Sequence, residues 1–303
     1  MYLLAVSTNI RPLAPWAARA EADPILPFID RETEQRVSEL EIPFNQYGVD
    51  PYGVSRKDIA RVMTISRWFY RTYFRMSVHG IEHVPPRGRT MLVGNHSGGV
   101  ALDAAMVVAS MFFEMDPPRL AQAMAEKFLN KVPFFSQFSN RLGHFTGLPE
   151  HAARLLEDER LLMVFPEGAR GTAKLYPERH SLVQFGTGFV RLAMKTRTPI
   201  VPFAFVGGGE AIPTVVNAYA LGRLFGAPYV PVTPYLFALP LPVRLSVEYA
   251  APVLLEGTGS EDDEHIQVHV DRIKDTIAGL IAVGVERRKN AGGARVEAPR
   301  EQA

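Results

Sequence analysis

The sequence predicts one α/β domain with a central, mostly parallel or mixed sheet flanked by helices. Short runs of Val, Ile, Leu and Phe alternate along the chain with longer segments of helical periodicity. This alternation favours strands that are joined by helices packed on the faces of a sheet. The chain has 303 residues, of which 47% are hydrophobic and 21% charged, and this composition supports one large core.

The N-terminal part differs in composition from the rest of the chain. We expect residues 1–76 to form an extension, residues 77–289 the main domain and residues 290–303 a flexible tail. In the extension, Arg31–Leu40 predicts a short helix and Arg56–Met76 a longer amphipathic one. The apolar face of the longer helix carries Ile59, Val62, Met63, Phe69, Tyr70 and Tyr73.

The opposite side of the longer helix is basic, because Arg67, Arg71 and Arg75 recur every four residues. Basic residues opposite aromatic ones suit an anionic membrane surface, so the helix is a candidate for membrane association. An ordinary helix packed on the domain, with its arginine face in water, explains the same pattern equally well.

Strands in the main domain are predicted where short apolar or alternating runs are bounded by turn residues. They cover Val78–Val84, Thr90–Val93, Leu120–Met124, Leu142–Phe145, Leu161–Phe165, Ile200–Val206 and Arg244–Tyr249. Helices are predicted where apolar residues recur at helical spacing. They cover Asp103–Met115, Glu126–Asn140, Glu150–Asp158, Leu182–Lys195 and Glu261–Arg288.

Two segments invite a prediction of membrane insertion, and we expect neither to span a bilayer. Met1–Val6 is apolar but lacks a basic leader, so it does not predict a signal peptide. Leu224–Val243 is a stretch of twenty uncharged residues, but five prolines interrupt it. Because a spanning helix with five prolines would leave backbone groups unpaired in lipid, we expect a loop on the protein or on the membrane surface.

Composition also excludes several kinds of site. A net charge of +1 gives no electrostatic basis for nucleic-acid binding. The absence of cysteine excludes a disulfide framework, a cysteine zinc site and a cysteine nucleophile. His79 and His83, like His265 and His269, lie four residues apart, but no zinc motif surrounds either pair and we expect no metal site.

Chemistry-bearing residues gather in two segments that each follow a predicted strand. The first, Gly94–Asp103, has the sequence Gly-Asn-His-Ser-Gly-Gly-Val-Ala-Leu-Asp, and the second is Val164–Gly171. Ligands of open α/β sheets bind at such strand ends. His96 followed by Asp103 supplies a base and a carboxylate that can orient it. We therefore expect these two residues to be catalytic.

Other residues in the two segments, and one just after the second, are candidates for substrate binding. Backbone N–H groups around Ser97 can face an oxyanion, since glycine permits close approach. Glu167 can accept hydrogen bonds from the hydroxyl groups of a polyol substrate, and Arg170 can bind a phosphate. Lys174 adds a second positive charge near Arg170. Glu167 and Arg170 can alternatively pair with each other. The predicted substrate-binding residues are Asn95, Ser97, Gly98, Gly99, Glu167, Gly168, Arg170 and Lys174.

These segments resemble the glycerolipid acyltransferase family, the phospholipid/glycerol acyltransferase or lysophosphatidate acyltransferase-like group. Its first block is Asn-His-x4-Asp, and its third, Phe-Pro-Glu-Gly-x-Arg, is matched throughout by Phe165–Arg170. Thr198–Phe203 is similar to the fourth block, and Phe185–Ala193 is similar to a branch that includes diacylglycerol acyltransferases. The resemblance runs from about Gly80 to Pro252.

The chain departs from the family pattern at two points. Asp103 lies seven residues after His96 rather than five, and we expect the extra residues around Gly98 to be looped out so that the pair still meets. In the second block, Arg141 precedes Gly143 instead of following a glycine, so the resemblance does not assign a phosphate-contacting role to this arginine.

The resemblance implies a glycerol-3-phosphate acyltransferase-like fold and an acyltransferase domain over residues 77–289. It implies a peripheral enzyme on the cytoplasmic face of a membrane, with the lipid bilayer as partner. The fatty acyl group would pass from acyl-CoA or acyl-carrier protein, without a further cofactor, to a glycerolipid hydroxyl. Lysophosphatidate is the default acceptor, and the route is direct attack without a covalent enzyme intermediate.

Three alternatives remain open. A neutral-lipid enzyme would acylate diacylglycerol or a long-chain alcohol, and the altered second block favours it slightly. A lipid esterase would use Ser97 as nucleophile, although no Gly-x-Ser-x-Gly segment surrounds this serine. A non-catalytic lipid-binding protein on the same scaffold would bind liposomes without turnover.

Overall fold

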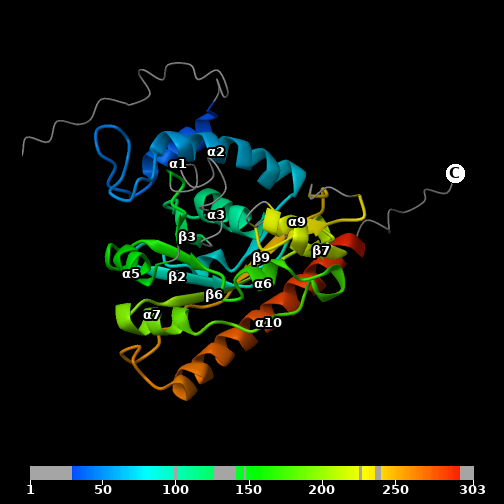
Figure 1. Cartoon of the computed structure of the whole chain (residues 1–303). Helices are drawn as coiled ribbons and strands as arrows, with labels where there is room; N and C mark the ends of the chain where they lie inside the picture. Colours follow the sequence, from blue (N-terminus) through cyan, green and yellow to red (C-terminus); the bar gives the residue numbers. More distant parts are fainter. Residues whose placement is uncertain are drawn as a thin grey trace, which may run out of the picture.

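A seven-stranded sheet, with strand order β1-β9-β6-β2-β5-β3-β4, forms the centre of the computed structural model (Figure 1). The model describes residues 29–98, 102–125, 141–146, 148–224, 227–235 and 240–293. The strands of this sheet are β1 (Ser77–His79), β2 (Thr90–Gly94), β3 (Ala121–Ala125), β4 (Phe145–Thr146), β5 (Leu161–Val164), β6 (Ile200–Val206) and β9 (Ser246–Tyr249).

Neighbouring strands of the sheet are parallel except for one pair. β6 and β9 run antiparallel, with Phe203 opposite Tyr249, whereas the other five pairs are parallel. A separate antiparallel pair is formed by β7 (Val216–Ala218) and β8 (Val230–Val232). The predicted α/β class with a mostly parallel, mixed sheet is confirmed.

Helices cover both faces of the sheet (Figure 1). On one face lie α1 (Arg31–Glu39), α2 (Arg56–Trp68) and α3 (Leu102–Glu114). On the other lie α5 (Pro149–Glu157), α7 (Gly188–Thr196) and α10 (Asp263–Gly293). All six were expected from the sequence, within a few residues at most boundaries.

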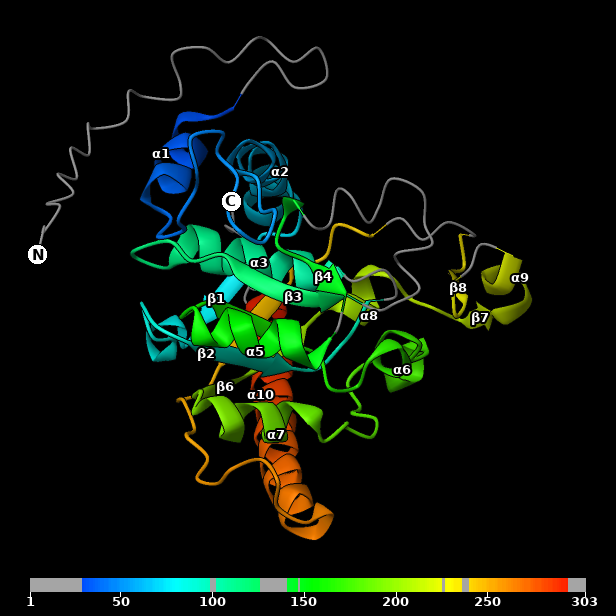
Figure 2. The same ribbon diagram turned by 60° about the vertical axis from the view of Figure 1, so that its left-hand side comes forward.

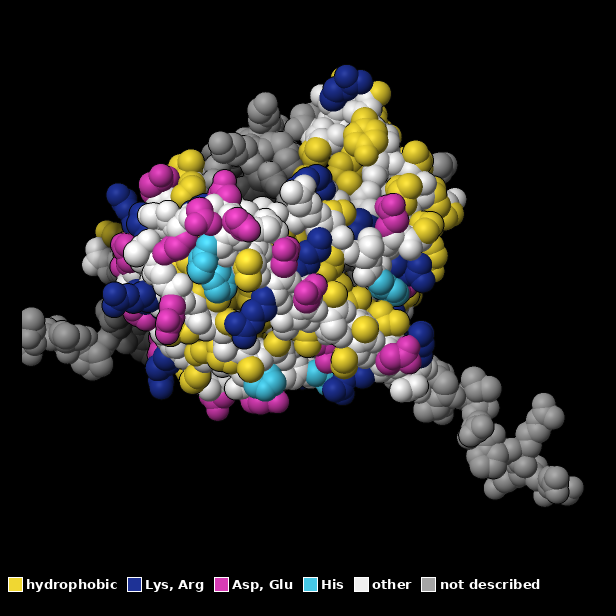
Figure 3. All heavy atoms as spheres, turned by 90° about the horizontal axis from the view of Figure 1, so that it is seen from below, with side chains coloured by type: hydrophobic (Ala, Val, Ile, Leu, Met, Phe, Trp, Pro, Cys, Tyr) yellow, Lys and Arg dark blue, Asp and Glu magenta, His cyan; other side chains and the backbone are white. Residues whose placement is uncertain are grey.

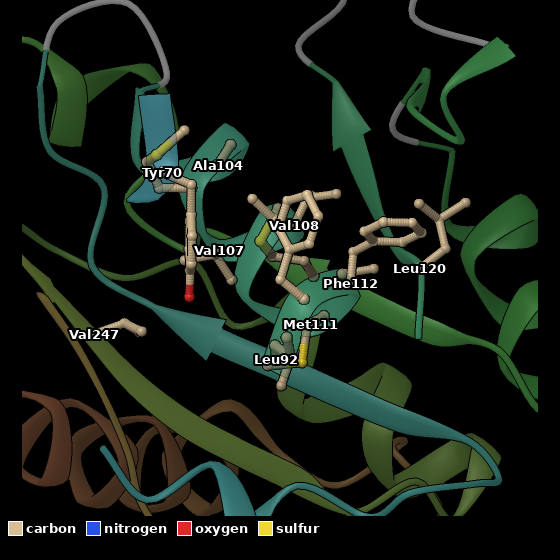
Figure 4. Packing of buried hydrophobic residues seen from close by; sticks show 14 of the residues in the cluster. Tyr70, Leu92, Ala104, Val107, Val108, Met111, Phe112, Leu120 and Val247 are labelled. Atoms are coloured by element: carbon tan, nitrogen blue, oxygen red, sulfur yellow. The ribbon is translucent and has the colours of Figure 1, made fainter. Parts of the chain in front are cut away.

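The core is divided by the sheet into two apolar clusters. Because successive side chains of a strand point to opposite faces, Leu92 packs with α3 while Met91 and Val93 pack with α5, α7 and α10. In Figure 4, Val107 and Met111 of α3 lie over the sheet close to Leu92. The two-sided burial explains why the central strands are continuously hydrophobic rather than alternating.

Two predicted strands were wrong in extent. The strand expected over Val78–Val84 ends at His79, and a single turn of 3₁₀ helix, Ile81–His83, follows. Gly80 causes the break: its φ of 75° is left-handed, and a Cβ there would lie 2.2 Å from Tyr249 O. Of the strand expected over Leu142–Phe145, only Phe145 lies in a strand, and this strand, β4, continues to Thr146.

The helix expected over Leu182–Lys195 begins only at Gly188. The residues before it hydrogen-bond instead to the Phe-Pro-Glu-Gly loop: Val183 N–H donates to Glu167 Oε2 at 2.8 Å and Gly186 N–H to Pro166 O at 2.9 Å. The helix expected over Glu126–Asn140 lies outside the described residues. At the other end, α10 continues to Gly293, beyond the expected start of the tail at residue 290.

The arginine side of α2 packs against α1. Arg67 Nε and Arg71 Nη2 each lie 2.7 Å from a carboxylate oxygen of Glu32, and Arg75 donates to Pro242 O at 3.0 Å. The helix continues as a short π-helical turn, Phe69–Tyr73, within the range predicted for it. Among the helices that the model describes, none has the length and hydropathy needed to cross a bilayer.

Candidate active site

The two predicted segments meet at one edge of the sheet. β2 and β5 are parallel neighbours, so the loop after Gly94 and the loop after Val164 leave the sheet at the same edge (Figure 2). The turn after β6, on the other side of β2, lies at this edge too. Strand pairing therefore brings residues seventy positions apart to one place, where ligands of such sheets bind.

His96 and Asp103 form a hydrogen-bonded pair. His96 Nδ1 lies 2.7 Å from Asp103 Oδ2, which also accepts the Ser97 N–H at 2.6 Å, and Asp103 Oδ1 accepts the Ala104 N–H at 2.8 Å. Asp103 is completely buried at the start of α3. As expected, the longer spacing is accommodated, and Gly98 contributes to the turn with a left-handed φ of 94°.

The pair fixes the protonation pattern of the imidazole. An ionised carboxylate only accepts hydrogen bonds, so the hydrogen on neutral His96 lies on Nδ1 and the lone pair on Nε2. His96 is partly exposed, whereas Asp103 is not. The arrangement is that of a general base whose tautomer is set by a buried acid, and it can accept a proton from a hydroxyl group.

The His96 side chain and its backbone are held from several directions. The ring stacks on Phe165 with centroids 4.2 Å apart and planes 14° from parallel. The His96 N–H donates to Glu167 Oε1 at 2.8 Å. Gly171 packs so closely that a Cβ there would lie 2.7 Å from His96 Cβ. The second motif thus acts as a support for the histidine of the first.

Glu167 lies inside the protein rather than facing an acceptor. Its carboxylate is buried, and Lys174 Nζ donates to both of its oxygens, to Oε1 at 3.1 Å and to Oε2 at 3.0 Å. The carboxylate also accepts the backbone N–H groups of His96 and Val183. Lys174 is buried with it and also donates to Ser181 O at 2.9 Å. The substrate-binding roles predicted for Glu167 and Lys174 do not fit this geometry, because each charge already has a buried partner.

Arg170 is the exposed cation of the second motif. It lies in the short helix α6 (Ala169–Thr172) and donates from Nη2 to Gln184 O at 3.2 Å. It does not pair with Glu167, so the internal ion pair considered as an alternative is not formed. Gly168 precedes α6 with φ 57° and ψ −154°, a region open essentially to glycine, and so shapes the loop that leads into α6.

Asn95 is a structural link between strands. Its Nδ2 donates to Phe205 O at 2.9 Å and its Oδ1 accepts from Phe205 N at 2.7 Å, so the buried amide ties the end of β2 to β6. Both polar atoms of the Asn95 side chain therefore contact the backbone of Phe205, and the substrate-binding role expected for Asn95 stays a prediction. The amide satisfies two backbone groups at the point where β2 ends.

Ser97 is also unsuited to the roles predicted for it. Its N–H is used by Asp103, so it is not an oxyanion donor. Its hydroxyl is buried against Gly208, where a Cβ would lie 2.9 Å from Ser97 Oγ. No hydrogen bond joins the side chains of Ser97 and His96 in the described structure, so the contact needed for a serine esterase is missing.

The two glycines that follow Ser97 were also predicted to bind substrate. Gly98 packs on Gly208, and Gly99 lies outside the described residues.

Replacing Asn95 with alanine is expected to lower the free energy of unfolding by about 2 kcal/mol or more. The substitution leaves the Phe205 N–H and C=O buried without partners, and each such group costs about 1–3 kcal/mol. Urea unfolding measures the change. Asn45, an exposed turn residue that accepts two backbone N–H groups, is the control, and its alanine variant should lose less. An equal loss in both variants would contradict the linking role.

A family model for acyltransferases matches residues 75–206, a range that contains both motifs. The uncharacterized protein Rv0502 of Mycobacterium tuberculosis is 32% identical over 257 residues, covering 81% of this chain and 70% of that protein. The chain belongs to the acyltransferase family. This result confirms the family inferred from the motifs, and it makes the protein an acyltransferase.

The chain is also similar, at lower identity, to one named lipid enzyme and to one solved acyltransferase structure. The DGAT1/2-independent enzyme synthesizing storage lipids of Bos taurus is 22% identical, over 70% of this chain and 64% of that enzyme. Among solved structures, the 1-acyl-sn-glycerophosphate acyltransferase PlsC of Thermotoga maritima matches with a TM-score of 0.49 and 18% identity. That match covers 74% of this chain and 81% of that one.

Proposed function

We propose that the protein transfers a fatty acyl group from a thioester, acyl-CoA or acyl-carrier protein, to a glycerolipid hydroxyl, with His96 as general base. The observation that carries the proposal is the 2.7 Å contact between His96 Nδ1 and the buried Asp103 carboxylate. It leaves Nε2 as the proton acceptor at the edge of the sheet where both family motifs converge.

The reaction follows from this geometry. His96 Nε2 removes the proton of the acceptor hydroxyl while the oxygen attacks the thioester carbonyl carbon. Asp103 stabilises the imidazolium that forms. The tetrahedral intermediate then breaks its C–S bond, and His96 returns the proton to the departing thiolate. No covalent enzyme intermediate is required, in keeping with the burial of Ser97.

Lysophosphatidate is the first acceptor to consider. Arg170 is exposed, and it precedes Gly171, which packs against His96. A guanidinium binds phosphate by charge-assisted hydrogen bonds and has more N–H donors than the bond to Gln184 uses. A phosphate held there would keep the neighbouring glycerol hydroxyl close to the base.

A neutral acceptor is the second candidate, and one observation favours it. Lys174, the other cation expected to bind phosphate, is buried against Glu167, so the second motif presents less positive charge than its sequence indicates. The name of the bovine relative, which refers to storage lipids, points in the same direction. Diacylglycerol or a long-chain alcohol would then replace lysophosphatidate.

Membrane association at the cytoplasmic face is part of the proposal because both acceptor classes reside in bilayers. Exposed Ile65, Trp68 and Phe69 on and beside the end of α2 support a peripheral contact. The arginines expected to contact anionic lipid are engaged by Glu32 or Pro242, so the support from this helix comes from its apolar residues.

Release of free CoA from palmitoyl-CoA tests the function. The purified protein is incubated in detergent or liposomes with lysophosphatidate, with diacylglycerol or without acceptor. Acceptor-dependent release supports acyl transfer, and the effective lipid defines the acceptor class. Release without any acceptor would contradict the proposal and indicate a thioesterase. An acyl-carrier-protein thioester, run in parallel, identifies the donor.

Replacing Arg170 with alanine is expected to raise KM for lysophosphatidate about 10- to 100-fold. The estimate follows from about 1.5–3 kcal/mol for a hydrogen bond to a charged group, at about 1.4 kcal/mol per tenfold change. KM for diacylglycerol should stay unchanged, as should KM for palmitoyl-CoA. If KM rises for the donor alone, Arg170 contacts the phosphates of CoA, and its proposed role toward the acceptor is refuted.

A further inference from the structure

Between β6 and β9 the chain leaves the sheet and forms a separate lobe. This lobe, residues 213–224 and 227–235 of the described structure, contains β7, α9 (Tyr219–Leu224) and β8. Figure 2 shows it projecting away from the sheet, beyond α6, on the side toward which the active-site loops point. No helix of the main core packs over its outer side in this view.

The lobe exposes a dense group of large apolar side chains. Five of them occur within ten residues, and each is between 42% and 77% exposed: Val215, Val216, Tyr219, Leu221 and Leu224. Single exposed apolar residues are ordinary, but a contiguous patch of them marks an interaction surface. Figure 3 shows hydrophobic side chains gathered where the lobe projects, at the upper right.

The charge of the lobe indicates what it contacts. From Ala211 to Val243 the sequence contains one charged residue, Arg223, and no acidic one. Apolar and tyrosine side chains accompanied by a basic residue suit the boundary between lipid headgroups and acyl chains. A lone cation among them is attracted by anionic headgroups, and the absence of carboxylates removes the repulsion that such a surface would otherwise meet.

The lobe is attached directly to the loop that carries the second motif. Asn217 Nδ2 donates to Ala173 O at 2.7 Å, and Tyr176 N–H donates to Thr214 O at 2.8 Å. The Tyr229 hydroxyl donates to Thr172 Oγ1 within α6. A membrane that binds the lobe would therefore lie close to the segment that carries Arg170 and Gly171. Gly171 in turn packs against His96.

We propose that the β7–α9–β8 lobe docks the enzyme on an anionic lipid bilayer, with Tyr219, Leu221 and Leu224 entering the interface. Docking there brings the loops that carry His96 and Arg170 close to the bilayer in which a membrane-resident acceptor diffuses. In assigning the bilayer as the source of the acceptor, the inference rests on the proposed function. It assigns the principal membrane contact to the lobe rather than to α2.

Flotation with vesicles of phosphatidylcholine and phosphatidylglycerol tests this assignment. The double variant Tyr219→Glu/Leu224→Glu should bind at least about tenfold more weakly than the wild type, because two apolar side chains no longer enter the lipid. Leu254→Glu/Val268→Glu is the matched control: both residues are 64% exposed and lie outside the lobe, and the control should bind normally. Leu224→Ser tests the same site without adding charge.

Other outcomes would overturn the lobe assignment. Equal losses of vesicle binding in lobe and control variants would do so, as would full binding by the lobe variants or loss of binding in Trp68→Glu alone.

Light scattering tests whether a second copy of the chain, rather than lipid, covers the lobe. An oligomer that the lobe variants dissociate, without weaker flotation, refutes lipid docking. Turnover of dispersed short-chain substrates should be unchanged in the lobe variants. Because flotation requires no turnover, failure of the acyl-transfer proposal would be recognised separately.

Discussion

Replacement of His96 by alanine is expected to lower kcat about 10²- to 10⁴-fold, the usual contribution of a positioned general base. The His96 ring is partly exposed and makes one side-chain hydrogen bond, to Asp103. The loss should therefore appear mainly in kcat, with a smaller change in KM. The measurement is the rate of CoA release with the preferred acceptor, at saturating donor.

A control variant and a second substitution sharpen this prediction. His265→Ala, in the exposed first turn of α10, should leave kcat unchanged. Asp103→Asn should also lower kcat, because an amide can donate to Nδ1 and stabilise the wrong tautomer. Wild-type kcat in His96→Ala, in a protein that unfolds like the wild type, would refute the role of this residue as base.

Loss of one member of the Glu167–Lys174 pair is expected to have the largest effect on stability. Lys174→Ala leaves the Glu167 carboxylate buried without its counter-charge, and breaking a buried pair in this way costs about 3–5 kcal/mol. Chemical denaturation measures the change. Lys289→Ala removes an exposed lysine that pairs with Glu286, and it should cost less than about 1 kcal/mol.

The double variant Glu167→Gln/Lys174→Met separates the ion pair from the packing around it. Removing both charges avoids an unpaired buried ion, so this variant should be more stable than Lys174→Ala. Its glutamine can still accept the His96 N–H through its carbonyl oxygen, which preserves part of the loop support. A double variant as unstable as the single one would show that lost packing, rather than an uncompensated charge, governs the effect.

The sequence predicted the location of the site better than the role of each residue in it. Two motifs placed after two buried strands indicated a shared edge, and the parallel pairing of β2 and β5 provides it. The contact between His96 and Asp103 was predicted on the expectation that the extra residues around Gly98 loop out, and Gly98 has a left-handed φ of 94° there. A motif does not state which side of a loop a side chain occupies, so the burial of Glu167 was not predictable.

The sequence did not reveal the roles of residues that act through long-range packing. Lys174 gave a basic signal in the sequence, but its partner is fixed only when the loop folds back over Glu167. Gly171 directly follows the motif arginine, and its contact with His96 arises from the close approach of two separate loops. The helix expected from Leu182 was shortened for a similar reason, because hydrogen bonds to the motif loop replaced those of a helical turn.

The lobe shows how an ambiguous sequence signal is clarified by structure. The proline-rich stretch Leu224–Val243 excluded a spanning helix, and its described part contains the short strand β8. The exposed apolar residues, however, lie mostly just before that stretch, in β7 and α9. Their exposure depends on the lobe projecting from the sheet, which periodicity alone does not reveal.

The central claim is direct acyl transfer with His96 as base, and the most direct measurement follows both products in one reaction. Wild-type protein is incubated with radiolabelled palmitoyl-CoA and the preferred acceptor, and free CoA and new lipid ester are quantified together. We expect equal amounts of the two products, no CoA release without acceptor, and loss of both products in His96→Ala. CoA release that exceeds ester formation, or ester formation that persists in His96→Ala, would contradict the account.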